Sequence, residues 1–406
     1  MSDFVSAGWS EEFPLMAAEG NTIAKKETWI ALLARRDTPT DGVQDYCAFL
    51  SRALETKGIH MALAQVRWME DGWLRGLRQL WRQSARWQGQ WVILQYTALA
   101  WSRHGFPFGA IATLAILRRR QVRFAVVFHE PSRQREASTR WIDRIRGACQ
   151  DWVIRTLYAR ATKAIFTIPL ERVAWLAWVP KRRDTAVFIP IGANIPEPVS
   201  GSEARRSSNQ LRTVVVFCFT RGPNRSLEAA DVVTTIRIVR EEGIQVQLIA
   251  LGGGSAEVRD EIECGLAGTG VEVSVLGLVP ADEVTNILSA ADAQLFVSGY
   301  VSQRRGSVLA GIACGLPIIG YAGGAEGTQI EEAGLFLVPF RDSKALGTGL
   351  VKVLRTEELA VHLRSRSRKA QSNHFSWISI ASRYVSALKT EIVPESSSRS
   401  VGDLHI

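Results

Sequence analysis

Residues 213–251 carry the clearest architectural signal in the chain, with the sequence TVVVFCFTRGPNRSLEAADVVTTIRIVREEGIQVQLIAL. An apolar run rich in β-branched residues leads through the turn RGPNR into a segment of helical length, which ends before a second apolar run. A strand, a helix and a strand in this order form a βαβ unit, whose two strands lie parallel. The passage therefore predicts a parallel sheet with helices packed on it.

The same alternation continues on both sides of this unit. Strand-like runs follow it at residues 271–276, 293–297 and 316–321, and precede it at residues 29–34, 59–66, 91–95, 122–128 and 164–168. A polar stretch rich in serine and arginine separates the two series. We therefore expect an α/β protein with two doubly wound, Rossmann-like parallel-sheet domains that face a cleft, at residues 28–197 and 211–374, joined by a linker at 198–210.

Composition predicts a globular protein that stays in the cytoplasm. The 406 residues are 46% apolar and 22% charged, which suits two domains of ordinary size. Residues 1–27 contain acids and lack a basic start followed by an apolar run, so we expect an extension rather than a signal peptide; residues 392–406 are expected to be a disordered tail. Charged residues interrupt the most apolar stretch, residues 91–117, so no transmembrane helix is expected.

Cysteine spacing and net charge narrow the classes of partner. The five cysteines lie far apart with no C-x-x-C pair, which argues against a disulfide framework and a structural zinc site, and no metal or cofactor is expected. The formal net charge of +9 is concentrated in the first half of the chain. A nucleic-acid-binding protein is one explanation of that charge, but no RNA- or DNA-binding module is recognisable, so no nucleic-acid partner is expected.

Three strand-to-helix turns are candidates for binding a diphosphate, because the N–H groups and the dipole at a helix start favour anions. The candidate residues in these turns are Gly42, then Arg221 and Arg225, and finally Arg305, Gly306 and Ser307. Ser307 is the expected N-cap of the last helix, and guanidinium groups suit a diphosphate because they can bind it through two hydrogen bonds. Ordinary alternatives remain open, namely a turn glycine and solvated arginines.

Two further candidates stand where strands end. His129 follows an apolar strand and shortly precedes Pro131, so its imidazole is expected to face the cleft as a catalytic group. Glu326 follows another strand and two glycines, where its carboxylate can accept hydrogen bonds from sugar hydroxyls. The alternatives are a loop histidine with satisfied hydrogen bonds and a solvated glutamate.

Residues 73–87 predict a strongly amphipathic helix. At about 100° per residue, aromatic and aliphatic side chains share one face and arginines lie opposite. The tryptophans and arginines of interest are Trp73, Arg75, Arg78, Trp81, Arg82 and Arg86. Two interpretations remain open: the aromatic face packs on the sheet, or the helix contacts anionic lipid headgroups and presents a membrane or acceptor surface. The second interpretation implies a peripheral position on the inner face of the plasma membrane.

Several segments, in order, resemble family 4 glycosyltransferases of the GT-B superfamily over nearly the whole chain. They are DGVQDY at 41–46, LQY at 94–96, FHE at 128–130, IPIGANIP at 189–196, RRGS at 304–307, ACGLP at 313–317, and HFSW at 374–377 followed by Ile380, Ala381 and Tyr384. The resemblance implies a GT-B fold, with a terminal helix at 375–391 that crosses back to the first domain.

The resemblance also implies an activity, namely metal-independent transfer of a sugar, with retention of configuration, from a nucleotide-diphosphate sugar to a glycan or lipid-linked acceptor, as in the synthesis of surface polysaccharides or glycolipids. His129 matches the family histidine near the transferring sugar, and Gly42 matches the loop glycine near the diphosphate. Basic groups and helix starts would stabilise the leaving diphosphate, a role we assign to Arg221, Arg225, Gly306 and Ser307.

The chain departs from the family at one pair of positions. The two glutamates that these enzymes carry eight positions apart align with Ser302 and Ala310, and Arg305 and Glu326 are candidates to replace them. The departure makes a catalytically degenerate subunit, which binds and regulates a partner transferase, the main alternative. A nucleotide-sugar epimerase on the same architecture is a further alternative.

Overall fold

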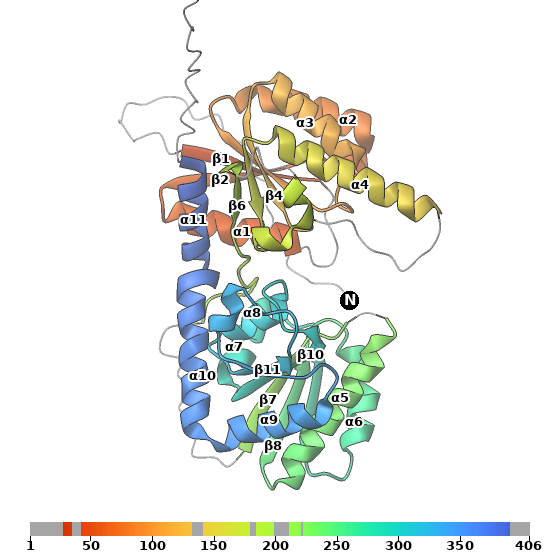
Figure 1. Cartoon of the computed structure of the whole chain (residues 1–406), viewed down its shortest axis with the longest axis vertical. Coiled ribbons are helices and arrows are strands. Elements are labelled where there is room, and N and C mark those ends of the chain that lie inside the picture. The colour runs from red at the N-terminus through yellow and green to blue at the C-terminus, as the bar shows by residue number, and fades with distance from the viewer. Residues whose placement is uncertain are drawn as a thin grey trace, which may run out of the picture.

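The computed structural model describes residues 27–34, 42–131, 141–178, 184–198, 211–220 and 222–389. Two domains follow one another along the long axis of the molecule, and each is built around its own parallel six-stranded sheet (Figure 1). The predicted pair of doubly wound domains is confirmed. The N-terminal extension, the greater part of the linker and the tail fall outside the described residues.

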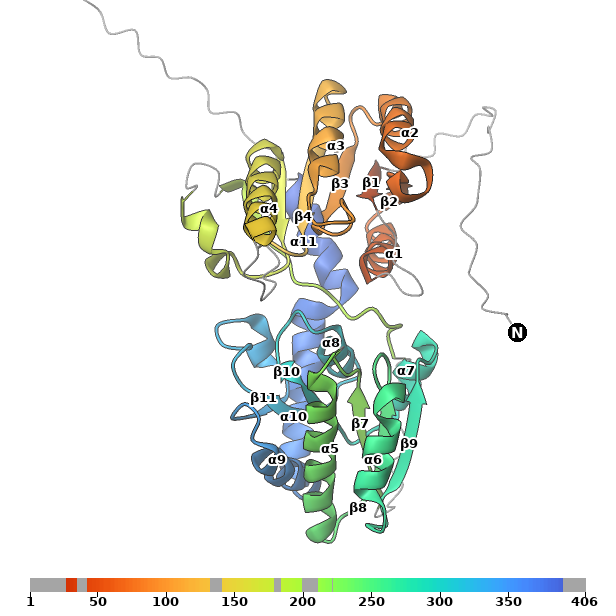
Figure 2. The ribbon, with the colours of Figure 1, turned by 90° about the vertical axis from the view of Figure 1, so that its right-hand side faces the viewer.

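The first domain is a sheet covered on both faces. Its strands, in the spatial order β2-β1-β3-β4-β5-β6, are all parallel and comprise β1 (Glu27–Leu33), β2 (Ile59–Gln65), β3 (Trp91–Tyr96), β4 (Arg123–Phe128), β5 (Lys163–Phe166) and β6 (Ala186–Phe188). One face carries α2 (Trp68–Gln83), α3 (Phe108–Arg119) and α4 (Trp141–Arg160), and the other carries α1 (Gly42–Glu55), as Figure 2 shows.

The second domain repeats this arrangement. In the spatial order β12-β11-β10-β7-β8-β9, its parallel strands are β7 (Leu211–Phe217), β8 (Gln245–Leu251), β9 (Glu272–Gly277), β10 (Ala293–Tyr300), β11 (Ile318–Tyr321) and β12 (Leu335–Val338). One face packs against α5 (Asn224–Glu241), α6 (Arg259–Leu266) and α9 (Ser343–Arg355), the other against α7 (Ala281–Ala290) and α8 (Gly306–Ala313).

Burial on both faces explains why the strands read as continuous apolar runs. Val214 and Val216 belong to one core cluster of the second domain, and Val215 between them belongs to the cluster on the opposite face. Each of these positions meets a helix layer, so this part of the strand is apolar without interruption, whereas β8 and β9 toward the sheet edge alternate with polar residues. The short strands β6 and β12, at one edge of each sheet, were not predicted.

The C-terminal helices join the two domains. Helix α10 (Glu357–Ala370) lies against the second domain, a π-helical turn (η7, Gln371–Phe375) follows, and α11 (Trp377–Lys389) packs beside α1 of the first domain (Figure 1). The indole of Trp377 stacks on Phe49 with ring centroids 5.7 Å apart. The predicted crossing of the terminal helix is therefore confirmed. Among the described residues, no helix is long and apolar enough to span a membrane.

Candidate active site

The carboxyl ends of β3 and β4 bring Gln95 and His129 together. The imidazole Nε2 of His129 lies 2.8 Å from Gln95 Oε1, and the Tyr46 ring of α1 meets the imidazole edge-on at 5.2 Å between centroids. The backbone N–H of His129 donates to the carbonyl of Tyr96. Parallel strands end at one edge of a sheet, so this half-buried histidine stands where ligands of such sheets bind.

Gln95 contributes an unpaired polar group to this site. Its side chain is 2% exposed, and its Nε2 has no hydrogen-bond partner among the residues that the structure describes. A buried amide without a partner costs about 1–3 kcal/mol, so such groups are rare except where a ligand or water completes them. The sequence analysis included Gln95 in a family motif but assigned it no role.

Helix α8 begins opposite His129 in the second domain. Its N-terminal hydrogen bond runs from the N–H of Leu309 to the carbonyl of Arg305, which leaves the N–H groups of the first helical residues at the helix start without an intrahelical acceptor. A Cβ placed on Gly306 would meet no atom of the described residues within 4 Å, so they leave the space at this helix start open. The predicted helix start is therefore present, and its role in binding an anion stays a prediction.

The N-cap prediction for Ser307 is wrong. The helix begins one residue earlier, at Gly306, and Arg305 is the N-cap without a side-chain capping bond. Ser307 lies inside the first turn, where its carbonyl accepts a hydrogen bond from the Gln294 amide at 3.0 Å. The helix can begin at Gly306 because glycine has no side chain to cover the backbone N–H groups of the first turn. These groups stay open to water or a ligand, so the helix forms without a hydroxyl cap.

Two arginines cross between the domains in opposite directions. The Arg304 guanidinium, just before α8, lies 3.5 Å from the carbonyl oxygen of His129. Arg172, which follows β5 of the first domain, donates to the carbonyls of Gly324 and Glu326 in the loop after β11. These contacts place the loops after β4, β5, β10 and β11 around one region at the domain junction. Arg172 was missed by the sequence analysis.

Glu326 lies in this region but its carboxylate already has a partner. One oxygen accepts the backbone N–H of Gly323 at 3.0 Å, which closes the turn after β11. The side chain is exposed, so the second oxygen still faces solvent at the junction. Glu326 is therefore brought to the predicted place, with a local structural role in addition.

Gly42 is tied to the second domain through the segment before the linker. The Asn194 amide donates to the Gly42 carbonyl at 3.0 Å, and the neighbours of Asn194, Ala193 and Ile195, pack in the same core cluster as α8. A Cβ on Gly42 would find only Asn194 Nδ2, at 3.9 Å. The helix starts of α1 and α8 thus flank one connecting segment, and the space at Gly42 is open.

Of the two predicted arginines in the RGPNR turn, only Arg225 belongs to the described residues. Arg221 lies outside the described residues. Arg225, in the first turn of α5, forms an ion pair with Glu257 at 3.6 Å. In this structure its guanidinium therefore faces an acid of its own domain, and the diphosphate role of Arg225 stays a prediction.

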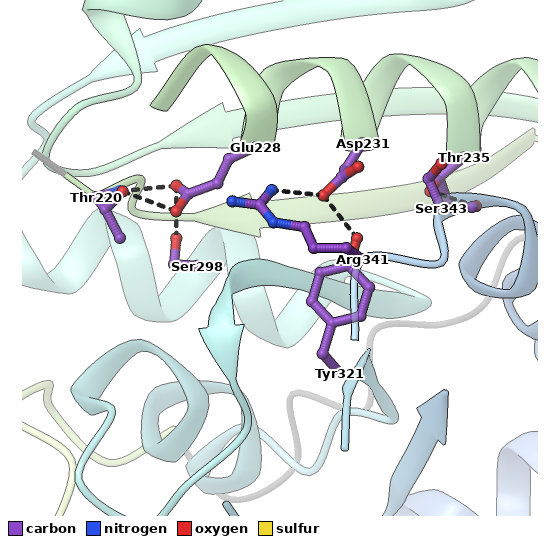
Figure 3. Close-up of polar contacts among 8 residues, drawn as sticks. All are labelled: Thr220, Glu228, Asp231, Thr235, Ser298, Tyr321, Arg341 and Ser343. Atoms are coloured by element: carbon purple, nitrogen blue, oxygen red, sulfur yellow. Dashed lines mark hydrogen bonds and ion pairs between the residues drawn. The ribbon is translucent and has the colours of Figure 1, made fainter. Parts of the chain in front are cut away.

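The buried Glu228 holds Thr220, the residue that precedes the same turn, through hydrogen bonds (Figure 3). The carboxylate of Glu228, 1% exposed, accepts hydrogen bonds from the Thr220 N–H at 2.8 Å, the Thr220 hydroxyl at 2.7 Å and the Ser298 hydroxyl at 3.1 Å. One turn along α5, Asp231 accepts from Tyr321 at 2.6 Å and from Arg341 at 2.9 Å. Burial, followed by the neighbouring Asp231, raises the pKa of the Tyr321 phenol, so that it stays a donor.

Ser302 and Ala310, which are predicted to stand in place of a pair of glutamates, bring no carboxylate to this region. Ala310 is buried in α8, and the carbonyl of Ser302 accepts the N–H of Arg305. Between them Gln303 is 3% exposed, and neither of its side-chain polar atoms has a hydrogen-bond partner among the described residues. An unsatisfied amide therefore lies next to Ser302, one of the two positions predicted to replace a glutamate.

The amphipathic segment is divided between core and surface. Trp73 stacks on Trp68 at 4.9 Å and covers Gly109 of α3, so it packs in the interior. Trp81 is 39% exposed, but the Arg120 guanidinium lies 3.7 Å above its ring. The four arginines of the predicted surface, Arg75, Arg78, Arg82 and Arg86, are exposed. The helix also starts earlier than predicted and is kinked at Gly72.

Several solved structures share this fold. Anabaena HepE, solved with UDP and glucose, is 13% identical with a TM-score of 0.58, and the match covers 89% of this chain and 100% of that one. Sucrose-phosphate synthase from Thermosynechococcus elongatus is 18% identical with a TM-score of 0.61, covering 89% and 98%. A glycosyltransferase from Rickettsia africae is 12% identical with a TM-score of 0.61, covering 90% and 100%.

These likenesses establish the architecture. The two parallel six-stranded sheets, the crossing terminal helix and the shared topology identify the fold as GT-B. No family model matches the sequence, and a search of curated proteins found no match. Among the described residues, no group of three or more histidine, cysteine, aspartate or glutamate side chains is arranged to hold a metal ion.

Proposed function

We propose that the protein is a glycosyltransferase that moves a sugar from a nucleotide-diphosphate sugar to a glycan or lipid-linked acceptor, in the synthesis of a surface polysaccharide or glycolipid. One observation carries the proposal. The His129 loop of the first domain meets the Arg304–Ser307 helix start of the second, with 3.5 Å between Arg304 and the His129 carbonyl. HepE, solved with UDP and glucose, supports a uridine diphosphate donor.

In this proposal the second domain stabilises the leaving diphosphate. The open N–H groups at the start of α8 and the guanidinium groups of Arg304 and Arg305 supply positive electrostatic potential where negative charge develops. Arg225 joins them if its ion pair with Glu257 opens on binding. These groups need no metal ion to act, and a diphosphate oxygen would take the proton of the acceptor hydroxyl, with retention of configuration.

The first domain positions the sugar. The hydrogen bond between Gln95 Oε1 and His129 Nε2 holds the imidazole in one orientation. It therefore also fixes the direction in which the other ring nitrogen, Nδ1, points. The unpaired amide groups of Gln95 and Gln303 would accept and donate hydrogen bonds to sugar hydroxyls, in place of the glutamates absent at Ser302 and Ala310. Glu326 is a further candidate for this contact.

A thermal-shift screen with UDP-, GDP- and dTDP-sugars tests the proposal. We expect one donor class to raise the Tm, because a ligand that binds only the folded state stabilises it. Arg304→Ala should weaken that binding by about 10- to 150-fold, since charge-assisted hydrogen bonds contribute about 1.5–3 kcal/mol. Arg355→Ala, which breaks an exposed ion pair at the far end of α9, is the matched control and should bind like the parent.

The alternative, a degenerate subunit that regulates a partner transferase, is favoured by Ser302 and Ala310. Incubating the purified protein with the bound donor separates the cases. Transfer to an acceptor supports the transferase, conversion of the donor without any acceptor indicates an epimerase, and binding without turnover indicates the regulatory subunit. If no nucleotide-sugar binds and Arg304→Ala behaves as the parent throughout, the proposed function is refuted.

A further inference from the structure

The outer face of α4 has an unusual composition for a helix in contact with water. Its exposed side chains recur at helical spacing along 20 residues and are Trp141, Arg144, Ile145, Ala148, Trp152, Arg155, Ala159 and Arg160. Trp141 is 72% exposed, Trp152 is 52% exposed and Ile145 is 48% exposed. Large apolar side chains therefore occupy the solvent side of this helix, although its opposite side already packs on the sheet.

Acidic residues are missing from this exposed set. The two aspartates of α4, Asp143 and Asp151, are half-buried, and Asp143 forms an ion pair with Arg146 at 3.0 Å. An open depression of about 520 Å³ follows the same helix, with Trp152, Arg155 and Arg160 among its lining residues. The half-buried Asp151 also lines this depression, so the outer face of α4 combines tryptophan with arginines and has no acid among its exposed residues.

Helix α3 extends this surface. Phe108 is 56% exposed, and its ring lies 6.3 Å from that of Trp152, while Arg118 and Arg119 are exposed at the other end of the same helix. Figures 1 and 2 both show α3 and α4 side by side on one face of the first sheet. We define the outer surfaces of α3 and α4 together as the α3–α4 face.

We propose that the α3–α4 face docks on an anionic phospholipid bilayer. Tryptophan and arginine side chains both suit the boundary between headgroups and acyl chains, where the ring is partly desolvated and the guanidinium meets phosphate. The arginines of this face carry the charge opposite to that of phospholipid phosphates, and the exposed residues of α3 and α4 include no acid. The α2 residues predicted from sequence differ, since Trp73 packs in the core and Trp81 lies under Arg120.

The orientation of α4 relates this face to the site. A helix that follows a strand in a doubly wound sheet runs antiparallel to it, so Trp141 lies at the edge where β4 ends and His129 stands. The most exposed tryptophan is therefore at the junction end of the helix. A bilayer held against the α3–α4 face would present a lipid-linked acceptor near the His129 loop. This step deepens the proposed function, but the docking itself is tested without any sugar donor.

The test is co-sedimentation of the full-length protein with vesicles of phosphatidylcholine alone or with added phosphatidylglycerol. We expect binding only to the anionic vesicles, with a decrease at high salt. Trp141→Ser/Trp152→Ser and Arg144→Gln/Arg155→Gln should each weaken it by about tenfold or more. The control Val361→Ser/Lys369→Gln changes exposed residues of the same kinds on α10 and should bind like the parent.

Four outcomes would overturn the proposal. The parent protein fails to sediment with anionic vesicles at low salt, or the α4 variants bind as the parent does, or the α10 control loses binding to the same extent. Loss of binding on Arg75→Gln/Arg78→Gln, with the α4 variants unaffected, would move the contact to α2 and also overturn it. Far-UV circular dichroism of every variant separates lost docking from lost folding.

Discussion

Two tyrosine hydroxyls hold the crossing helix to the first domain, and removing them one at a time should cost more than removing both. Tyr46 of α1 and Tyr384 of α11 are 2% and 0% exposed, and their hydroxyl oxygens lie 2.8 Å apart. Burial raises the pKa of both phenols, so both stay protonated across the range in which the protein is folded. Each hydroxyl therefore depends on the other for its buried hydrogen bond.

The expected magnitudes follow from this pairing. Tyr384→Phe leaves the Tyr46 hydroxyl buried without its partner and should lower the free energy of unfolding by about 1–3 kcal/mol. The double variant Tyr46→Phe/Tyr384→Phe leaves neither hydroxyl and keeps both rings, so its cost should stay within about 1 kcal/mol. The coupling energy of the double-mutant cycle should thus be about 1–3 kcal/mol, and the double variant should be more stable than the sum of the two single losses predicts.

Urea unfolding followed by tryptophan fluorescence measures this cycle. All 13 tryptophans except Trp377 precede residue 200, so the signal reports the domain on which α11 packs. Tyr96→Phe is the matched control, because the Tyr96 hydroxyl is buried with no partner among the described residues and its removal should not destabilise the protein. Additive losses in the double variant, or a neutral Tyr384→Phe, would refute the reasoning.

Three further predictions concern the second helix layer, the diphosphate site and the cysteines. Glu228→Ala removes the acceptor of the half-buried Thr220 N–H and hydroxyl, so the free energy of unfolding should fall by about 2–4 kcal/mol and the Tm measured by circular dichroism should fall with it; an unchanged Tm would contradict this. Gly42→Ala should leave the Tm unchanged, because among the described residues the added Cβ would meet only Asn194 Nδ2, at 3.9 Å, yet weaken UDP binding in calorimetry; equal affinities would remove Gly42 from the site. Burial raises the pKa of Cys314 to about 11, so at pH 8 about one molecule in a thousand carries the Cys314 thiolate. Iodoacetamide reacts with the thiolate, so mass spectrometry should find the label first on the exposed Cys264. Earlier labelling of Cys314 would disprove this.

The fold could be predicted from the sequence because its signal is local and repeated. Each apolar run and each helical segment of the βαβ series lies within a window of about 18 residues, which is the range over which periodicity is informative. The strand end that carries His129 was predicted for the same reason, since Pro131 marks where β4 stops. Parallel topology then places all strand ends at one edge without further information.

The site was less predictable because its contacts join residues far apart in the chain. Arg172 reaches the loop at Gly324 across 152 positions, and nothing around Arg172 distinguishes it from a solvated loop arginine. The tryptophans of α2 show the same limit. Periodicity predicted which of them share a face, but the packing of Trp73 on Trp68 and Gly109 depends on the tertiary position of α3.

Helix α11 makes the first domain discontinuous in sequence. Residues 377–389 supply the outer layer over α1 and bury Ile380 and Tyr384 against it, although nearly two hundred residues separate them from the rest of that domain. During synthesis this layer can form only after the entire second domain has left the ribosome. A polypeptide ending at residue 198 would therefore present an apolar groove to water, and adding residues 377–389 as a separate peptide should fill it.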